Sequence, residues 1–258
     1  MDEKLLLDFA ISVGEIMLES GAETQRVEDT MERILSTSTY NLMPETFVTP
    51  TGLFAGITGP LSGSVTKVKR IQKRIINLEK VSAANELSRD FVAGKISLRE
   101  AFDRLNEISL LPDYKLHIQL IAYTLIPFAF TLLFNGTVKD SIWAASTGFI
   151  LTFITEFLTR NKTAGFLKSF LCGLSITILI VIYYYLNMTD NYEIIIKGAI
   201  MPLVPGFAIT NAARDIMYGD YISGGAMIID AALTAVFVAA GVATGLMFLH
   251  DMFGGVFV

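Results

Sequence analysis

Residues 222–249 read ISGGAMIIDAALTAVFVAAGVATGLMFL, and this stretch decides the class of fold. Its 28 residues contain a single charged side chain, Asp230. A helix needs about 20 apolar residues to cross the hydrocarbon core of a bilayer, whereas buried helices of soluble proteins have shorter apolar runs. The stretch therefore predicts a membrane-spanning helix.

Four upstream stretches resemble it in composition. We expect the five spans at residues 117–134, 141–158, 166–186, 194–209 and 222–249. The sequence therefore predicts an α-helical integral membrane protein with five transmembrane helices, embedded in a lipid bilayer.

Charge separates this membrane part from the rest of the chain. Residues 1–116 hold 14 basic and 17 acidic side chains, whereas residues 117–258 hold only 6 and 8. We expect a small cytoplasmic α+β domain over residues 1–115 and a transmembrane domain over residues 116–258. The net charge of -5 excludes a nucleic-acid binder, and the single cysteine, Cys172, excludes an internal disulfide.

Basic residues in the short loops predict the orientation. Arg160 and Lys162 follow the second span and Arg214 follows the fourth, which places these loops in the cytoplasm. A secretory signal has a basic segment followed by an apolar one, and the N-terminus lacks this pattern. We expect the N-terminal domain inside and, after five spans, the C-terminus outside.

The soluble part mixes two periodicities. Apolar residues at helical spacing predict helices over 2–20, from 23 onward, over 78–93 and over 98–108, and β-rich composition predicts strands within 46–59 and 64–71. Between the first two helices, Ser20 and Glu23 have the spacing of a capping box, although Gly21 fits equally well as the cap of the preceding helix.

The fourth span is short and contains the sequence PLVPG at residues 202–206. Two prolines remove backbone donors and disfavour helix at the preceding residue. Broken spans mark transporter binding sites, but a proline kink used for packing gives the same pattern. The candidates here are Pro202, Pro205 and Gly206.

A dense polar segment follows this span. Arg214 is suited to bidentate binding of a substrate carboxylate, although Arg214 and Asp215 also fit an interfacial charge pair. We predict substrate binding or gating by Asn211, Arg214, Asp215, Gly219 and Asp220.

Asp230 lies well inside the last span, where an ionisable group costs about 2.5–3.5 kcal/mol. It shares a helix face with small and polar residues such as Gly241 and Gly245, so we expect it to face protein or water. Asp230 is a candidate for proton coupling, or only a hydrogen-bonding partner of a neighbouring helix. Glu156, near the inner end of the second span, is a second coupling candidate or an interfacial charge.

Residues 20–30, SGAETQRVEDT, form the densest polar cluster of the soluble part. They fit a functional site, or a solvated helix face with Glu23–Arg26 and Asp29–Arg33 pairs. The motif residues are Gly21, Glu23, Thr24, Arg26, Glu28 and Asp29. The sequence contains no P-loop, nucleophile elbow or metal-spaced histidines, so we predict no catalytic residue, metal or cofactor.

Two segments, SGAETxRVEDT (20–30) and PxxPG–NxxRD–GDYxSG (202–224), resemble the threonine/serine exporter family. The resemblance implies a bacterial-type inner-membrane exporter with a cytoplasmic N-terminal domain. With five spans, the chain is similar to the short, YjjP-type form, which implies a second small membrane subunit. It also implies transport of threonine and serine, or of a dicarboxylate such as succinate.

Three hypotheses follow. The first is a secondary exporter of a small carboxylate-bearing or amino-acid substrate, in which Arg214 holds the carboxylate and Asp230 couples protons. The second is a membrane-anchored hydrolase that uses the Glu23–Asp29 carboxylates. The third is a regulatory or assembly subunit. The small-residue face of the last span also makes a homo-oligomer plausible.

Overall fold

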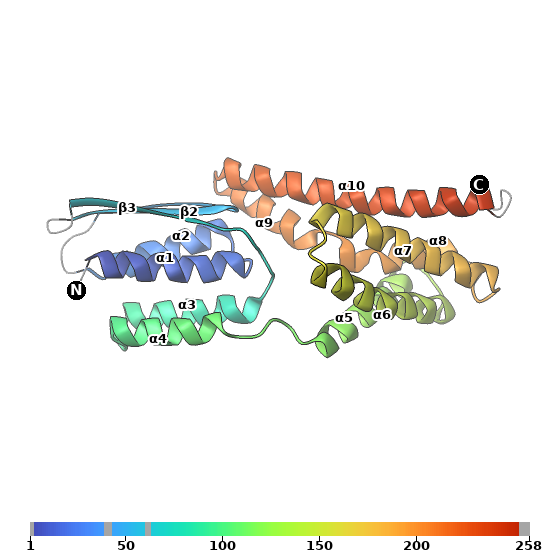
Figure 1. The fold of residues 1–258 in the computed structure, drawn as a ribbon, viewed down its shortest axis with the longest axis horizontal. Coiled ribbons are helices and arrows are strands. Elements are labelled where there is room, and N and C mark those ends of the chain that lie inside the picture. The colour runs from blue at the N-terminus through green and yellow to red at the C-terminus, as the bar shows by residue number, and fades with distance from the viewer. Residues whose placement is uncertain (1–2, 39–42, 60–62, 253–258) are drawn as a thin grey trace. The chain divides into compact units, whose positions relative to one another are not determined.

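The computed structural model describes residues 3–38, 43–59 and 63–252. The chain forms two compact units (Figure 1), one of residues 1–113 with 210–227 and the other of residues 114–209 with 228–258. We expected the first domain to end at residue 115. The structure adds a segment from far along the chain, 210–227, to the compact N-terminal unit.

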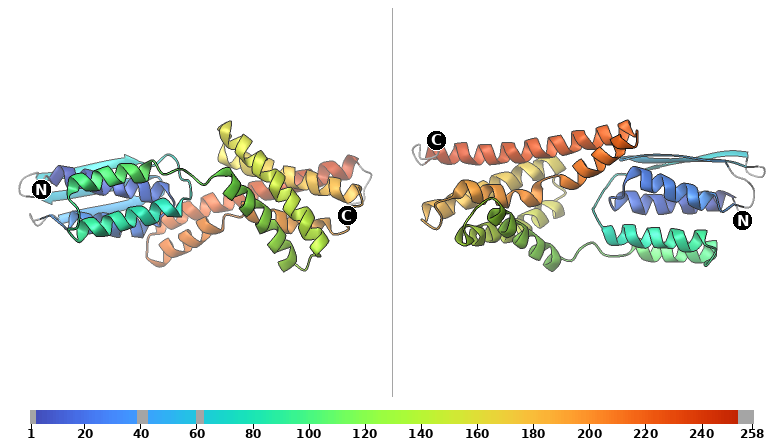
Figure 2. Two further views of the ribbon diagram at one scale, coloured as in Figure 1. Left: turned by 90° about the horizontal axis from the view of Figure 1, so that it is seen from below. Right: turned by 180° about the vertical axis from the view of Figure 1, so that it is seen from behind.

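The N-terminal unit is built in layers. Its elements are α1 (Glu3–Glu19), α2 (Thr24–Leu35), β1 (Met43–Thr49), β2 (Gly52–Gly59), β3 (Gly63–Arg70), α3 (Leu78–Val92) and α4 (Leu98–Ser109). The antiparallel sheet, in the order β1-β2-β3, packs on α1 and α2, and α3 and α4 cover the opposite side of α1 (Figure 2). This arrangement confirms the predicted helices and strands.

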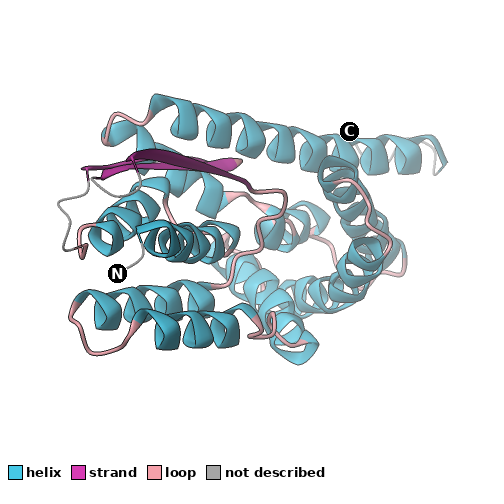
Figure 3. Cartoon of the chain, turned by 60° about the vertical axis from the view of Figure 1, so that its left-hand side comes forward, coloured by secondary structure: helices cyan, strands magenta, loops and turns pink. Residues whose placement is uncertain are grey.

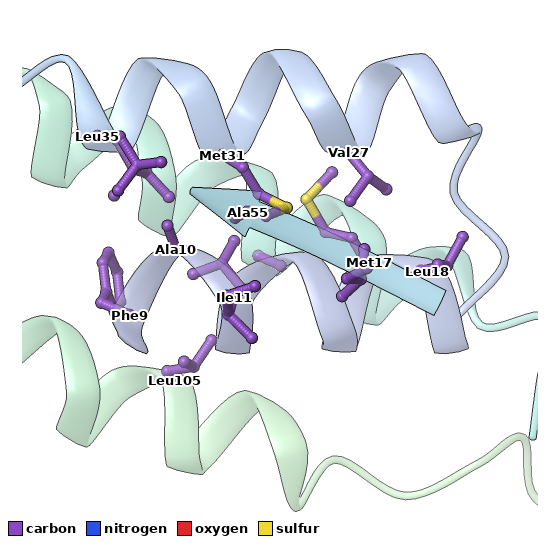
Figure 4. Packing of buried hydrophobic residues seen from close by; sticks show 14 of the residues in the cluster. Phe9, Ala10, Ile11, Met17, Leu18, Val27, Met31, Leu35, Ala55 and Leu105 are labelled. Carbon is purple, nitrogen blue, oxygen red and sulfur yellow. The ribbon is translucent and has the colours of Figure 1, made fainter. Parts of the chain in front are cut away.

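The core of this unit lies around α1. Phe9 contacts the rings of Phe91 and Phe102 edge-on, with centroids 5.0 and 5.4 Å apart. Toward the sheet, Met17 and Met31 lie close to Ala55 (Figure 4), and all three are buried. Burial of such side chains, about 1.5–3 kcal/mol each, stabilises the unit.

The turn between α1 and α2 resolves the alternative at Ser20. Gly21 adopts φ 94°, and the N–H groups of Gly21 and Ala22 donate to the carbonyls of Leu18 and Met17. Gly21 therefore caps α1, as only a residue tolerant of positive φ does easily. The capping box would require Ser20 to be the N-cap of α2. The N-cap is Glu23 instead, and its side chain forms no hydrogen bond to the helix, so the box does not form.

The second unit is helical (Figure 3). Its elements are α5 (Leu116–Leu133), α6 (Val138–Arg160), α7 (Gly165–Tyr185), α8 (Tyr192–Ala199), the 3-10 turn η1 (Met201–Leu203), and parts of α9 (Gly206–Met217) and α10 (Tyr221–Met252). Within residues 3–38, 43–59 and 63–252, four helices are long and apolar enough to cross a membrane: α5, α6, α7 and α10. The count rises to five if α8–η1 and α9 together form one span.

The predicted break in the fourth span is present. The segments 192–203 and 206–217 meet at an angle of 56°. Pro202 lies within η1, and Pro205 directly precedes α9. The PLVPG sequence therefore separates α8 and η1 from α9, as the missing donors and the restriction before proline require.

Glycines allow α10 and α7 to pack closely. A Cβ added at Gly245 would lie 2.8 Å from the Cβ of Thr177, and Gly241 leaves no room for a side chain against the backbone at Phe170. Gly173 of α7 meets Val238 of α10 in the same way. The neighbour of the small-residue face is therefore the third span of the same chain.

Asp230 was expected to face protein or water. It is exposed on α10, and no described residue forms a hydrogen bond or ion pair with its carboxylate. The predicted face is not continuous, because Gly241 and Gly245 are buried against α7 whereas Ala226 and Asp230 are open. Thus the chain itself does not cover the carboxylate.

Candidate functional site

The two polar motifs, nearly 200 residues apart in sequence, meet in the N-terminal unit. Arg214 forms an ion pair with Glu23. The Thr24 hydroxyl donates to Asp220 at 3.2 Å, and the Ser223 hydroxyl donates to the carbonyl of Val48 at 3.1 Å. We call this group the Glu23–Arg214 cluster: Glu23, Thr24, Glu28, Val48, Arg214, Asp215, Asp220 and Ser223.

Glycines shape the hairpin between α9 and α10. Gly219 has φ 90°, and its N–H donates to Ile216 while the N–H of Asp220 donates to Asp215. A Cβ on Gly224 would lie 2.9 Å from the carbonyl oxygen of Ala212, so glycine allows the two helices to approach closely. The hairpin thereby brings Asp215, Asp220 and Ser223 to one side of the unit.

Val48 connects both halves of the cluster. It lies on β1, an edge strand, whose outer backbone groups have no strand partner. Its N–H donates to Glu28 at 2.7 Å, and its carbonyl accepts from Ser223. Val48 was not predicted as a site residue. It takes part through its backbone N–H and carbonyl, which every residue has, so the sequence gives no sign of this role.

Glu28 is a half-buried carboxylate. Burial raises its pKa to about 6 from an ordinary value of 4.5, and the nearby carboxylates of Asp220, Glu32 and Asp29 act in the same direction. The hydrogen bond from Val48 lowers the pKa and offsets part of this effect. Glu28 therefore titrates within reach of physiological pH.

Asp215 is the most unusual member of the cluster. Its side chain is only 1% exposed, and no described residue donates a hydrogen bond of normal geometry to either carboxylate oxygen, although the Thr24 hydroxyl and the guanidinium groups of Arg74 and Arg214 lie nearby. Asn211, one helical turn earlier, is 4% exposed, and its amide nitrogen also has no partner among the described residues. A buried carboxylate without well-formed hydrogen bonds is costly when ionised, so this position favours a proton.

Arg214 and Glu23 have a different environment. Their side chains are 44% and 20% exposed, so solvent and solutes reach the pair. The expected Glu23–Arg26 and Asp29–Arg33 pairs are absent from the described ion pairs, because Glu23 pairs with Arg214 instead. Arg26 and Asp29 line a groove on another side of α2.

The remaining predicted residues lie outside the cluster. Pro202, Pro205 and Gly206 belong to the second unit. Glu156 forms an ion pair with Arg160 at 2.7 Å, one turn along α6. Among the described residues, no group of three His, Cys, Asp or Glu side chains has the geometry to hold a metal ion.

Four helices suited to crossing a membrane and a broken fifth candidate are the features of a helical membrane protein among the described residues. The family model ThrE, "Putative threonine/serine exporter", matches residues 8–249. Because the match covers nearly the whole chain, the chain belongs to the threonine/serine exporter family. No curated protein and no solved structure matches it.

Proposed function

We propose that this chain is a secondary-type exporter, or half of one, of a small carboxylate-bearing metabolite, with L-threonine or L-serine as substrate. Family membership supports an exporter-type transporter rather than an enzyme. We further propose a bacterial-type inner-membrane location with five spans, an N-terminal domain in the cytoplasm and the C-terminus outside.

The observation that carries the proposal is the exposed Glu23–Arg214 pair. The Glu23 carboxylate occupies the guanidinium that a substrate carboxylate would bind. Because Arg214 is 44% exposed, a substrate can replace Glu23 without unfolding the cluster. Replacement would release Glu23 from Arg214 and change the link between α2 and the α9–α10 hairpin.

The surrounding charges favour an amino acid over succinate. Glu28, Asp215 and Asp220 accompany Arg214 in the cluster, and the guanidinium of Arg74 also lies near Asp215. A second carboxylate on the ligand would add repulsion, whereas the ammonium group of threonine or serine would be attracted. Succinate, carried together with a second small membrane subunit, remains the alternative substrate.

Proton coupling has three candidate carboxylates. Asp230 is exposed on the chain and would need a homo-oligomer or second subunit to cover it. Glu156 is paired with Arg160 at the end of α6. Asp215 is buried without a hydrogen bond of normal geometry from the described residues, and we regard it as the strongest of the three.

The hydrolase alternative has less support. The carboxylates of the Glu23–Asp29 segment have different surroundings, because Glu23 pairs with Arg214, Glu28 accepts from the Val48 N–H, and Asp29 lines the groove on another side of α2. Paired carboxylates must converge on one bond to hydrolyse it. A regulatory role with a separate transporting partner is tested by the experiment that follows.

The test is counterflow in proteoliposomes that contain the purified chain. Vesicles are loaded with unlabelled threonine, serine or succinate, and entry of the same labelled solute is followed. We expect threonine or serine uptake, a loss of at least about tenfold in Arg214→Gln, and a smaller loss in Arg214→Lys. Arg104→Gln is the matched control, since Arg104 pairs with Glu100 on α4 outside the cluster.

The other outcomes separate the alternatives. Succinate counterflow alone would contradict the amino-acid substrate. No uptake by folded chain, with uptake restored by a co-purified membrane subunit, would identify a half-transporter if Arg214→Gln still abolishes flux. Flux that is unchanged in that complex by Arg214→Gln would identify a regulatory subunit and overturn the proposal.

A further inference from the structure

A groove of about 380 Å³ lies between α2 and α3 of the N-terminal unit. Three arginines line it: Arg26 and Arg33 from α2, and Arg89 from α3. None of its lining residues belongs to the Glu23–Arg214 cluster. The groove is therefore a separate feature, and any ligand it binds need not be the transported solute.

The three arginines have no acidic partners among the residues that the structure describes. Other basic residues of this unit do form ion pairs: Lys95 pairs with Asp90, and Arg104 pairs with Glu100. Asp29 lies in the same groove without forming a described ion pair to Arg26 or Arg33. In a chain with a net charge of -5, three unpaired guanidinium groups around one hollow indicate a place for an anion.

The spacing of the arginines suits a ligand with more than one anionic oxygen. Arg26 and Arg33 are seven residues apart, which is about 10 Å along a helix axis. Arg89 adds a third guanidinium from the facing helix. Guanidinium groups bind phosphate through paired N–H donors, and several around one groove favour phosphate over a single carboxylate.

The other lining residues complete a site for a nucleotide-sized molecule. Asn85 supplies an amide, the Asp29 carboxylate can accept from hydroxyl groups, and Val92 supplies an apolar end. A second hollow of about 550 Å³ shares Asp29, Arg33 and Val92 with the groove and extends toward Glu32, Ser36 and Thr37. These volumes fall within the range of small-molecule sites, about 300–1,000 Å³.

We propose that the groove between α2 and α3 binds a phosphate-bearing small molecule, with its phosphate groups held by Arg26, Arg33 and Arg89. The phosphate could belong to a soluble nucleotide or to a lipid headgroup. Both sources use the same guanidinium contacts, so the experiment must separate them.

The test is equilibrium binding to the full chain purified in detergent. The probes are labelled ATP, inorganic phosphate and short-chain phosphatidylglycerol. We expect ATP to bind, and Arg33→Gln or Arg89→Gln to weaken binding by about tenfold each. Arg99→Gln is the matched control, because Arg99 is an exposed arginine of α4 that does not line the groove.

The melting temperature of each variant shows whether it is folded, and Arg33→Lys shows whether charge alone suffices. Binding of phosphatidylglycerol but not ATP, lost in the same variants, would support the phosphate site with a lipid source. The proposal is overturned if no probe binds to folded chain, or if binding is unchanged in Arg33→Gln and Arg89→Gln. Because binding is measured without transport, this result is independent of the counterflow assay.

Discussion

Two buried aspartates, Asp140 in the helical unit and Asp215 in the N-terminal unit, have opposite surroundings. Asp140 is 2% exposed and accepts hydrogen bonds from Thr137, Thr189 and Asn191 at 2.8–3.0 Å. Asp215 is 1% exposed and accepts none of normal geometry from the described residues. The first carboxylate holds α6 to the segment before α8, whereas the second is available to a proton or ligand.

Asp140→Ala tests the structural half of this comparison and has the largest expected effect on stability. The substitution removes the carboxylate that accepts hydrogen bonds from three side chains, and it leaves their buried donors unpaired. We expect the free energy of unfolding to fall by about 3 kcal/mol. Denaturant unfolding of the purified chain in detergent measures it. A loss below about 1 kcal/mol would mean that the network contributes little to stability.

Asp215→Asn should have the opposite effects: little change in stability and a loss of proton-coupled export. The free energy of unfolding should stay unchanged or rise by up to about 1 kcal/mol, because an unpaired buried carboxylate is removed. Net export driven by a pH gradient should be lost while counterflow persists, since exchange does not require net proton movement. Asp230→Asn is the parallel variant, and loss of coupling there with normal coupling in Asp215→Asn would reverse our ranking.

Glu28 offers a pH-dependent test within the cluster. Its pKa in the folded chain, about 6, exceeds the ordinary 4.5, so the folded state binds the proton more tightly. Its contribution is therefore most favourable below pH 4.5 and is lost as pH rises through about 6, by at most about 2 kcal/mol before solvent screening. The free energy of unfolding, measured between about pH 4.5 and pH 6, should depend less on pH in Glu28→Gln than in wild type. The same pH dependence of the free energy of unfolding in both proteins would contradict a raised pKa of Glu28.

Glu156→Gln has the smallest expected effect. The Glu156–Arg160 pair is an exposed pair within one helix and contributes about 0.3–0.5 kcal/mol. Stability and pH-driven net export should both stay close to wild type. Loss of pH-driven export would instead make Glu156 a coupling residue.

Much of the fold was predictable because its signals are local. Residues 222–249 and the PLVPG break are read from composition and proline chemistry, and the structure has both features. The helices and strands of the N-terminal unit were predicted from periodicity over short windows, but their layered packing was not. At Gly21, sequence left two caps open, because the choice depends on a backbone φ of 94° that residue types permit but do not require.

The candidate site was predicted in parts and not as a whole. Both motifs were recognised, but local spacing paired Glu23 with Arg26, whereas the fold pairs Glu23 with Arg214. Contacts of such long sequence separation depend on how the α9–α10 hairpin packs. Helical spacing placed Asp230 on one face with Gly241 and Gly245, but spacing does not tell which part of a face a neighbour covers, and only the two glycines pack against α7.

The central claim is that a substrate carboxylate replaces Glu23 on Arg214, and Glu23→Gln tests it most directly. The measurement is the half-saturating concentration of threonine or serine in counterflow, with Glu19→Gln as the control from the same segment outside the cluster. The account predicts that Glu23→Gln lowers this concentration about tenfold, since the competing carboxylate is gone. An unchanged or higher half-saturating concentration, in folded protein, would contradict it.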